Sequence, residues 1–420
     1  MNINEILKGV DCNCGKHHEC AIDRVYIEHG AMKHFTELCV GYNKILIVAD
    51  ENTYGAAGEK TEAALAGKEI YKVIFAGSEI LIPNEAAIET VENILADAEV
   101  IIGIGSGVIQ DLCKYVSMDK GIPYMICATA PSMDGYASSG AAMILKGMKE
   151  TVPAGVPKAI VADTEVLKNA PKEMIKAGYG DIIGKFSALN DWKLSHAVNN
   201  EYFCEYIYDL TLDMVNRTLE LSEGIANGDE ESIGTLMQAL VIVGILMSFA
   251  GSSRPASGSE HHLSHFFEIT GIIDNKPYFP HGIDVAYSTV ITAQIRSQIL
   301  KKQFPGKIYR QSTEEYKKTM NDIYKSIADE CVMLQDRIGN YTTDRITAYH
   351  AHEAEIRDIL SEIPSGDEIK EMLGAVGLDI KEFYDLYGEE KIKTAVKYAK
   401  DLKDRYTVLW LNYDLFGGNI

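Results

Sequence analysis

The feature that most constrains the fold is an alternation, over about the first 165 residues, between short apolar runs rich in β-branched residues and helix-like segments. The runs read KILIVAD, EIYKVIF, AEVIIGIGSG and PYMICATAP. Strands that alternate with helices form parallel sheets, because a parallel pair needs a long crossover connection. We therefore predict an α/β domain with a parallel sheet, which binds its ligands where the strands end.

The remainder of the chain has a different pattern. After PKAIVADTEVLKNAP the segments are long, they carry apolar residues at the helical period of 3.6, and almost no strand candidates interrupt them. The 420 residues also exceed the roughly 250–300 residues at which single cores stop growing. The sequence thus predicts two domains, an α/β domain over residues 1–165 and an all-helical domain over residues 166–420.

Charge and hydropathy exclude several classes of partner. The 40 Lys and Arg residues against 61 Asp and Glu give a net charge of −21, which disfavours nucleic acid and anionic lipid surfaces. The amino terminus lacks a basic stretch followed by an apolar one, so we expect no secretory signal and a cytoplasmic protein. The longest apolar run, LMQALVIVGILMSFAG from Leu236, falls short of the roughly 20 residues of a membrane span, which predicts a buried core helix.

A glycine-rich loop follows the third of these strand-like runs. In VIIGIGSGVIQDLCKYVS an apolar strand leads through Gly103, Gly105, Ser106 and Gly107 into an amphipathic helix. Glycines let the backbone approach a pyrophosphate, and the helix offers free N–H groups at its positive end. The last glycine comes one residue earlier than in the usual GxGxxG pattern. A tight strand-to-helix turn without a ligand is the alternative.

Two further polar segments are expected at the same edge of the sheet. CATAPSMDGYASSGAAM ends the next strand and carries four polar side chains: Thr129, Ser132, Asp134 and Ser138. Asp50 ends KILIVAD, where a carboxylate can bind a ribose hydroxyl and repel a 2′-phosphate. Asp50 is equally well placed to cap a helix that begins near Thr53.

Three of the 11 histidines lie together in SSRPASGSEHHLSHFFEITG. If the segment is helical from Glu260 onward, His261 and His265 share one face, and His262 points about 100° away around the helix. One metal ion can then bind His261 or His262, but hardly both. Each histidine can also be a surface or core residue with no ligand.

Two more candidate metal ligands lie elsewhere in the sequence. His281 precedes a probable helix in YFPHGIDVA, and Asp181 stands beside glycines in AGYGDIIGK, at what we expect to be a helix start. Two imidazoles and one carboxylate with open positions suit zinc, nickel or iron(II). Asp181 can otherwise serve as an N-cap or as the i,i+4 partner of Lys185.

Taken together, these segments resemble a known family. GSGVIQD, ATAPSMDGYASSGA, GYGDIIGK, SSRPASGSEHHLSHFFE and PHGIDVA, in this order, resemble the sn-glycerol-1-phosphate dehydrogenases, especially their bacterial AraM-like branch. That family has the dehydroquinate synthase-like fold shared with iron-containing alcohol dehydrogenases and glycerol dehydrogenases. The resemblance extends from about residue 45 to residue 290, and LKDRYTVLWL near the carboxyl end also fits.

The resemblance implies a metal-dependent, NAD(P)H-linked oxidoreductase that interconverts dihydroxyacetone phosphate and sn-glycerol 1-phosphate, a product plausibly used for ether-type phospholipids. The implied ligands of one divalent metal are Asp181, His261 and His281. His261 is preferred to His262 because its spacing to His265 matches the family's pair of ligand and substrate residues. The implied metal is nickel, as in the bacterial relatives, or zinc, as in the archaeal ones, and iron is possible.

Further roles are carried over from the family in the same way. Substrate contacts are implied for Asp134 and His265. The NAD(P)-binding residues of the α/β domain would be Asp50 at the adenosine ribose, Gly105, Ser106 and Gly107 at the phosphates, and Thr129, Ser132 and Ser138. The helical domain would bind metal and substrate, and the enzyme would be a homodimer or higher homo-oligomer.

The substrate phosphate needs a cation, and Arg254 and Lys185 are our candidates from the sequence. An ordinary ion pair is about as good an explanation of either residue. Two other functions remain open at this stage: a glycerol or other polyol dehydrogenase acting on an unphosphorylated substrate, and a catalytically silent relative that binds metal or nucleotide.

The amino-terminal segment DCNCGKHHEC is a separate candidate. Four of its residues have metal-binding side chains: Cys12, Cys14, His18 and Cys20. The spacing lacks the paired CxxC knuckles of common zinc sites, so structural or incidental use is the favoured interpretation.

Overall fold

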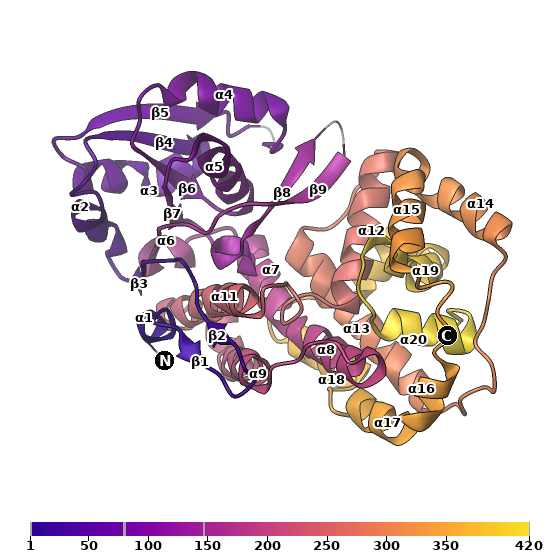
Figure 1. The fold of residues 1–420 in the computed structure, drawn as a ribbon. Helices are drawn as coiled ribbons and strands as arrows, with labels where there is room; N and C mark the ends of the chain where they lie inside the picture. Colours follow the sequence, from indigo (N-terminus) through magenta and orange to yellow (C-terminus); the bar gives the residue numbers. More distant parts are fainter. Residues whose placement is uncertain (1, 79–80, 146–147, 420) are drawn as a thin grey trace. The chain divides into compact units, whose positions relative to one another are not determined.

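The computed structural model describes residues 2–78, 81–145 and 148–419 (Figure 1). The chain forms two compact units. The first comprises Met1–Tyr179 and Asn216–Ser252, and the second comprises Gly180–Val215 and Ser253–Ile420.

A six-stranded parallel sheet forms the centre of the first unit. Its strands are β3 (Arg24–Glu28), β4 (Lys44–Asp50), β5 (Glu69–Phe75), β6 (Val100–Gly105), β7 (Tyr124–Ala128) and β10 (Ala159–Asp163). They pair in the order β3-β10-β7-β6-β4-β5, and every pair is parallel. The predicted parallel sheet is confirmed, and the four runs expected as strands form β4, β5, β6 and β7.

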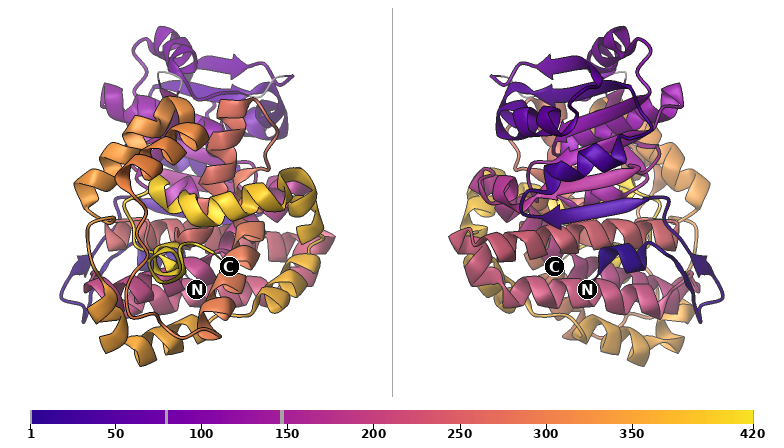
Figure 2. Two further views of the ribbon diagram at one scale, coloured as in Figure 1. Left: turned by 90° about the vertical axis from the view of Figure 1, so that its right-hand side faces the viewer. Right: turned by 90° about the vertical axis from the view of Figure 1, so that its left-hand side faces the viewer.

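Side-chain alternation along the strands builds a core on each face of the sheet. On β4, Ile45 and Ile47 pack on one face with residues of α3 (Glu51–Ala64), whereas Leu46 packs on the other face with residues of α4 (Glu85–Leu95) and α5 (Gly107–Lys120). The strand is apolar from Ile45 to Ala49 because both of its faces are covered there, as is usual for parallel sheets. Helices therefore lie on both sides of the sheet (Figures 1 and 2).

The strand order creates a crevice at one end of the sheet. From β4 the chain goes outward to β5 and then crosses back to place β6 on the other side of β4. Connections that leave two neighbouring strands in opposite directions open a crevice at the carboxyl ends of those strands. Asp50 ends β4 and Gly105 ends β6, so both residues lie at this crevice.

One long helix supports the sheet's polar loops from within the same unit. In α11 (Glu230–Ala250), a Cβ on Gly244 would lie 2.6 Å from the carbonyl oxygen of Asp134, so glycine permits a close approach to that loop. Among the described residues α11 alone has the length and composition to cross a membrane, and 83% of its most apolar window is buried. The run from Leu236 thus lies in a buried core helix, as predicted.

The second unit is helical. Its helices include α8 (Lys185–Asn199), α12 (Ser259–Asp274), α13 (His281–Leu300), α14 (Thr313–Tyr324), α19 (Ile380–Tyr398) and α20 (Val408–Phe416). Within residues 164–419 the structure has no strand, which confirms the predicted helical carboxyl-terminal part. The division predicted at residue 165 follows the change from strands to helices, whereas the compact units follow packing and include α11 in the first unit.

Two small antiparallel hairpins were not foreseen from the sequence. One joins β1 (Val10–Asp11) to β2 (His17–His18), and the other joins β8 (Gly140–Leu145) to β9 (Met148–Pro153). Both lie in the first unit.

Candidate active site

Asp181 is held near the carboxyl end of α7 (Lys172–Ile183). The expectation of a helix start at this position is wrong, because the glycines beside Asp181 serve helix packing. A Cβ on Gly180 would lie 2.5 Å from the carbonyl oxygen of Gly282, and one on Gly184 would lie 2.6 Å from a methyl carbon of Val285. The missing side chains let this turn approach α13 closely. Asp181 is fully buried as a result.

Three imidazoles lie beside this carboxylate. The helical geometry of α12 places His261 and His265 on one face, as predicted, and His281 is the first residue of α13. The ring centroids are 5.0 Å apart for His261 and His281, and 5.6 Å apart for His265 and His281. The ligand atoms of Asp181, His261 and His281 all lie within 4.8 Å of one another. The structure thus brings together the three residues that the sequence suggested as metal ligands.

His262 is absent from this group. It is fully buried, and neither of its ring nitrogens has a hydrogen-bond partner among the residues that the structure describes. Burial lowers the pKa of His262 well below its ordinary value, so this imidazole is neutral at pH 7. Of the two adjacent histidines, His261 is the one whose Nε2 faces Asp181, with 3.7 Å between Nε2 and Oδ1.

Glu260 fixes the tautomer of His261, a role that the sequence analysis missed. Oε1 of Glu260 accepts a hydrogen bond from the backbone N–H of Gly258 at 2.8 Å and lies 2.6 Å from Nδ1 of His261. An ionised carboxylate only accepts hydrogen bonds, so with Glu260 ionised Nδ1 of His261 carries the proton. Nε2 therefore presents its lone pair to Asp181. A carboxylate behind a metal-binding histidine is a usual supporting arrangement.

The charge state of the group suits a divalent cation. Burial by itself would raise the pKa of Asp181, but the ammonium of Lys185, 2.7 Å from Oδ1, and the two imidazoles hold it below its ordinary value. Burial and Lys185 lower the pKa of His261 well below its usual range. At pH 7 the group is therefore a carboxylate with a neutral His261, which is the protonation state that metal binding requires. The carboxylate of Asp181 attracts positive charge, as its contact with the ammonium of Lys185 shows. Together with the two imidazoles it offers donor atoms that fit a bound divalent metal ion.

The two sequence candidates for a phosphate-binding cation are engaged within the second unit. Lys185 is fully buried and donates to Asp181 and to the carbonyl oxygen of Ala256, 3.0 Å away. Nε of Arg254 donates to Glu201 at 2.6 Å, and Nη1 donates to the carbonyl oxygen of Tyr406 at 2.9 Å. In both cases the structure shows the ion pair that was the alternative interpretation.

Arg405 is a third cation beside the histidine segment. Its Nη1 donates to the carbonyl oxygen of Ser257 at 3.1 Å, and its Nη2 donates to Oγ of Ser253 at 2.5 Å. The guanidinium thus binds the loop that leads into α12, and its charge helps to lower the pKa of His261, after burial, Lys185 and His281. Arg405 lies in LKDRYTVLWL, a segment that fits the family resemblance. The sequence alone gave it no role, because its contacts with Ser253 and Ser257 appear only in the folded unit.

At the crevice of the sheet in the first unit, a cavity of about 220 Å³ is lined by Asp50, Asn52, Gly77, Leu81, Ser106, Val108 and Ile109. Oδ1 of Asp50 accepts from the backbone N–H groups of Asn52 and Thr53, each at 2.9 Å, so the capping role weighed from the sequence is present. The same side chain also lines the cavity. Capping and ligand binding are therefore compatible at this position.

Two glycines of the loop, Gly105 and Gly107, differ in the reason for having no side chain. A Cβ on Gly105 would lie 2.6 Å from Cβ of Ile109, so packing alone excludes a side chain there. A Cβ on Gly107 would meet only Cε of Met133, at an ordinary 3.8 Å. Because its space is open, Gly107 is the glycine whose absence of a side chain keeps room free at the start of α5.

The second polar loop is tied to the first. The backbone N–H of Thr129 donates to the carbonyl oxygen of Gly105 at 3.1 Å, and Oγ of Ser138 donates to the carbonyl oxygen of Gly135 at 3.0 Å. Lys114 of α5 is buried and donates to the carbonyl oxygens of Gly135 and Gly140, at 3.1 and 2.7 Å. Sequence analysis missed Lys114, since a lysine on an amphipathic helix gives no sign of burial.

Ser132 and Asp134 belong to the same loop. Ser132 precedes a 3₁₀ turn, Asp134–Ala137, and its backbone N–H donates to the carbonyl oxygen of Ala130 at 3.0 Å. All the residues that the sequence suggested for cofactor binding thus lie in the first unit, on loops at the carboxyl ends of β4, β6 and β7.

Comparisons with known proteins identify relatives of the whole chain. Residues 26–171 match the family model of the iron-containing alcohol dehydrogenases. A glycerol-1-phosphate dehydrogenase [NAD(P)+] of Bacillus licheniformis is 31% identical over 407 residues, which cover 95% of this chain and 90% of the relative. The enzyme of the same name from Geobacillus thermodenitrificans is 35% identical over 293 residues, covering 67% of this chain and 72% of the relative.

Solved structures show the same fold at lower identity. An iron-containing alcohol dehydrogenase from Thermococcus thioreducens aligns with a TM-score of 0.61 at 14% identity, covering 93% of this chain and 97% of the other. A sulfoacetaldehyde reductase from Bifidobacterium kashiwanohense, solved in complex with NAD+, aligns with a TM-score of 0.62 at 13% identity, covering 94% and 97%. These similarities show that the chain has the fold of the iron-containing alcohol dehydrogenases.

Proposed function

Since this chain belongs to the glycerol-1-phosphate dehydrogenase family, we propose that it interconverts dihydroxyacetone phosphate and sn-glycerol 1-phosphate with NAD(P)H and one divalent metal ion. The observation that carries the proposal is the convergence of Asp181, His261 and His281, with His265 beside them, on one point of the second unit, where Asp181 and His261 are buried and the other two histidines are half-buried. A carboxylate and two imidazoles bind a metal while leaving coordination positions open for a substrate oxygen.

The dinucleotide binds at the sheet crevice of the first unit. Ser106 and Gly107 present the N–H groups at the start of α5 to the phosphates, and Asp50 meets the adenosine ribose. Thr129, Ser132 and Ser138 add contacts from the neighbouring loop. The carboxylate of Asp50 repels a 2′-phosphate, so we expect a preference for NADH over NADPH. When bound, the nicotinamide supplies the hydride for C2.

Asp181, His261 and His281 hold the metal, which when bound withdraws electron density from the C2 carbonyl and stabilises negative charge on its oxygen. Glu260 keeps Nδ1 of His261 protonated, so that Nε2 remains available as a ligand. Lys185 holds the carboxylate of Asp181 in place. Nickel, zinc and iron(II) all suit these donors, and we propose nickel because the family resemblance favours it among bacterial relatives.

His265 is the imidazole of the cluster that is not required as a ligand. Its ring lies 6.1 Å from that of His261, on the same face of α12. We assign it the proton transfer at the C2 oxygen, because a histidine side chain can exchange a proton near pH 7, the imidazolium donating it and the neutral imidazole accepting it. Asp134, on the loop after β7, is proposed to orient the substrate hydroxyl groups.

The phosphate of the substrate is proposed to bind Arg405. Its guanidinium donates hydrogen bonds to Ser257 and Ser253, and the exposed carboxylate of Asp404 lies 4.0 Å from its Nε, whereas Arg254 and Lys185 donate directly to the carboxylates of Glu201 and Asp181. A phosphate gains more from a guanidinium that is not already neutralised by a bound carboxylate. The charge of Arg405 also attracts a dianionic substrate to a protein whose net charge is −21.

Steady-state kinetics test the proposal. The protein is stripped with a chelator, reloaded with nickel, zinc or iron(II), and mixed with NADH and either dihydroxyacetone phosphate or unphosphorylated dihydroxyacetone. We expect metal-dependent NADH oxidation with the phosphorylated substrate and much less without the phosphate. Turnover of dihydroxyacetone alone would indicate a polyol dehydrogenase, and no turnover with any metal would indicate a silent relative. The cytoplasmic location and the homo-oligomeric state stay predictions.

A further inference from the structure

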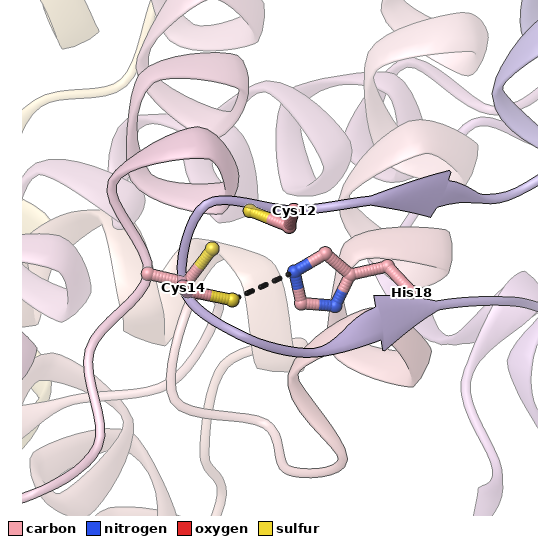
Figure 3. Close-up of side chains that lie close together, drawn as sticks. Cys12, Cys14 and His18 are labelled. Atoms are coloured by element: carbon pink, nitrogen blue, oxygen red, sulfur yellow. Dashed lines mark hydrogen bonds between the residues drawn. The ribbon is translucent and has the colours of Figure 1, made fainter.

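The amino-terminal hairpin of the first unit gathers three soft ligands. Cys12 and Cys14 lie on the turn between β1 and β2, and His18 ends β2 (Figure 3). The sulfur atoms of the two cysteines and a ring nitrogen of His18 lie within 4.8 Å of one another. Nε2 of His18 lies 3.3 Å from Sγ of Cys14, and Figure 3 shows the imidazole directed at that sulfur. None of these residues belongs to the proposed active site.

The imidazole of His18 has the orientation and the tautomer of a metal ligand. Its Nδ1 lies 3.0 Å from the carbonyl oxygen of Phe249 at the end of α11, and its ring stacks on that of Phe249 with centroids 5.5 Å apart. A carbonyl oxygen only accepts hydrogen bonds, so Nδ1 carries the proton and Nε2 carries a lone pair. The side chain is fully buried. Metal-binding histidines usually donate their second ring N–H to a carbonyl or carboxylate in this way.

We propose that Cys12, Cys14 and His18 bind a structural zinc ion, separate from the metal of the active site. Two thiolates and an imidazole select zinc over magnesium and calcium, which prefer oxygen ligands. Each thiol releases one proton on binding, and the two thiolate charges balance the 2+ charge of the ion. Structural zinc is four-coordinate, so a fourth ligand completes the site.

The hairpin is short, so a metal link would add to its stability. Its ladder consists of two residue pairs, Val10 with His18 and Asp11 with His17, and its turn places Gly15 in the left-handed region at φ +85°. Isolated two-stranded hairpins are at best marginally stable in water. A zinc ion bound by the turn and by His18 fastens the hairpin to the end of α11, because His18 is already fixed on Phe249. The site therefore anchors the start of the chain to the first unit.

Cobalt substitution tests the proposal on the full-length protein. Reduced, metal-free protein is titrated with Co²⁺, and the near-ultraviolet charge-transfer absorption of cobalt–thiolate bonds is recorded. We expect this absorption to reach its maximum by two equivalents per chain, because the proposed active site also binds the ion without contributing to the band, and to disappear when excess Zn²⁺ is added. The proposed active site has no sulfur ligand and cannot produce the signal, so the result does not depend on the proposed function.

Matched variants locate the signal. Cys12→Ser and Cys14→Ser are expected to lose most of the absorption, and His18→Gln to lower the cobalt affinity at least tenfold. Cys20→Ser serves as the control for the thiols, because Cys20 lies on the same segment but outside the three-residue group. His17→Gln is the control for His18→Gln, since His17 is exposed and its Nδ1 pairs with Asp11 at 2.8 Å. Both controls are expected to keep the full signal.

A second measurement needs no variant. Thiols of the folded, metal-free wild-type protein are counted with a chromogenic thiol reagent before and after addition of two equivalents of Zn²⁺, enough for both proposed sites, and at least two reactive thiols should become protected. Absence of a charge-transfer band, a band that survives in both Cys12→Ser and Cys14→Ser, or unchanged thiol reactivity would overturn the proposal. So would a Cys12–Cys14 disulfide in protein purified with metal present.

Discussion

Removal of the Lys185 ammonium tests the account of the metal site through stability and not through activity. Lys185 and Asp181 form a fully buried ion pair with 2.7 Å between Nζ and Oδ1. The change Lys185→Met keeps an unbranched side chain of similar length and deletes the charge. In the absence of metal, Asp181 then remains as a buried carboxylate without its ammonium partner.

The size of the effect follows from the burial of the pair. Removing one partner of a buried ion pair costs about 3–5 kcal/mol. The second unit contains about 200 residues, and at this size each kcal/mol lowers the melting temperature by roughly 2–4 °C. Metal-free Lys185→Met protein should therefore unfold roughly 6–20 °C below the wild type. Part of the cost is recovered if Asp181 takes up a proton, which places the observed value toward the lower end.

A divalent cation should reverse the loss. In the wild type Lys185 repels a metal ion at Asp181, whereas in the variant the ion replaces the missing charge. The increase in melting temperature on adding nickel or zinc should consequently be larger in Lys185→Met than in the wild type. Differential scanning calorimetry with chelator and with each metal measures both values.

A second buried ion pair in the same unit provides the matched control. Lys400 and Asp401 are both fully buried, 2.8 Å apart, and lie outside the metal-binding group. Lys400→Met should lose a similar amount of stability, but metal should not restore it. If metal stabilises the two variants equally, or if Lys185→Met melts like the wild type in chelator, the assignment of Asp181 as a metal ligand is contradicted.

Five further substitutions have expected outcomes. His261→Ala should lower the metal bound in equilibrium dialysis by one equivalent per chain, whereas His262→Leu, at a buried imidazole without hydrogen bonds in the described structure, should leave it unchanged; the reverse result would make His262 the metal ligand. Asp50→Asn preserves the helix cap but removes the charge, so the ratio of kcat/KM for NADPH to that for NADH should rise roughly tenfold, about 1.4 kcal/mol; an unchanged ratio would exclude contact with the ribose. Gly107→Ala should fold normally, because its Cβ meets an ordinary 3.8 Å contact, yet raise the Kd for NADH in fluorescence titrations; unchanged binding would remove the loop from the cofactor site. Arg405→Met should raise KM for dihydroxyacetone phosphate about 10- to 100-fold, equivalent to about 1.5–3 kcal/mol, and leave dihydroxyacetone unaffected; equal losses on both substrates would contradict a phosphate contact.

The sheet was predictable because the apolar run that marks a buried strand lies within a few consecutive residues. Strands buried on both faces are continuously apolar, and β4 and β6 show this directly in KILIVAD and VIIGIG. The strand β3 has the less apolar sequence RVYIE, with exposed residues at both ends, and it gave no such signal. The strands of the amino-terminal hairpin have two residues each, which is too few for an alternating or continuous apolar pattern to be recognised.

The metal-binding group was predictable only in part. The spacing of His261 and His265 is a helical property and therefore appears in the sequence. The approach of Asp181 and His281 is a tertiary property, and it entered through the family resemblance. The glycines around Asp181 suggested a helix start, because a glycine required by close packing looks the same in a sequence as one required at a helix end.

The charged partners were the least predictable part. Arg254 was expected at a phosphate but pairs with Glu201, more than 50 positions away in the chain, and the buried position of Lys114 is equally invisible in a helical pattern. Long side chains choose partners by proximity in the folded unit. A sequence therefore indicates which residue types are available for the proposed site, but not which ion pairs they form.

The configuration of the reaction product tests the central claim most directly. Nickel- or zinc-loaded protein is incubated with dihydroxyacetone phosphate and NADH, and the glycerol phosphate formed is assayed with enzymes specific for each enantiomer. The account predicts sn-glycerol 1-phosphate, formed in proportion to NADH consumed and absent with His261→Ala. Formation of sn-glycerol 3-phosphate, or NADH consumption that is independent of the metal, would contradict it.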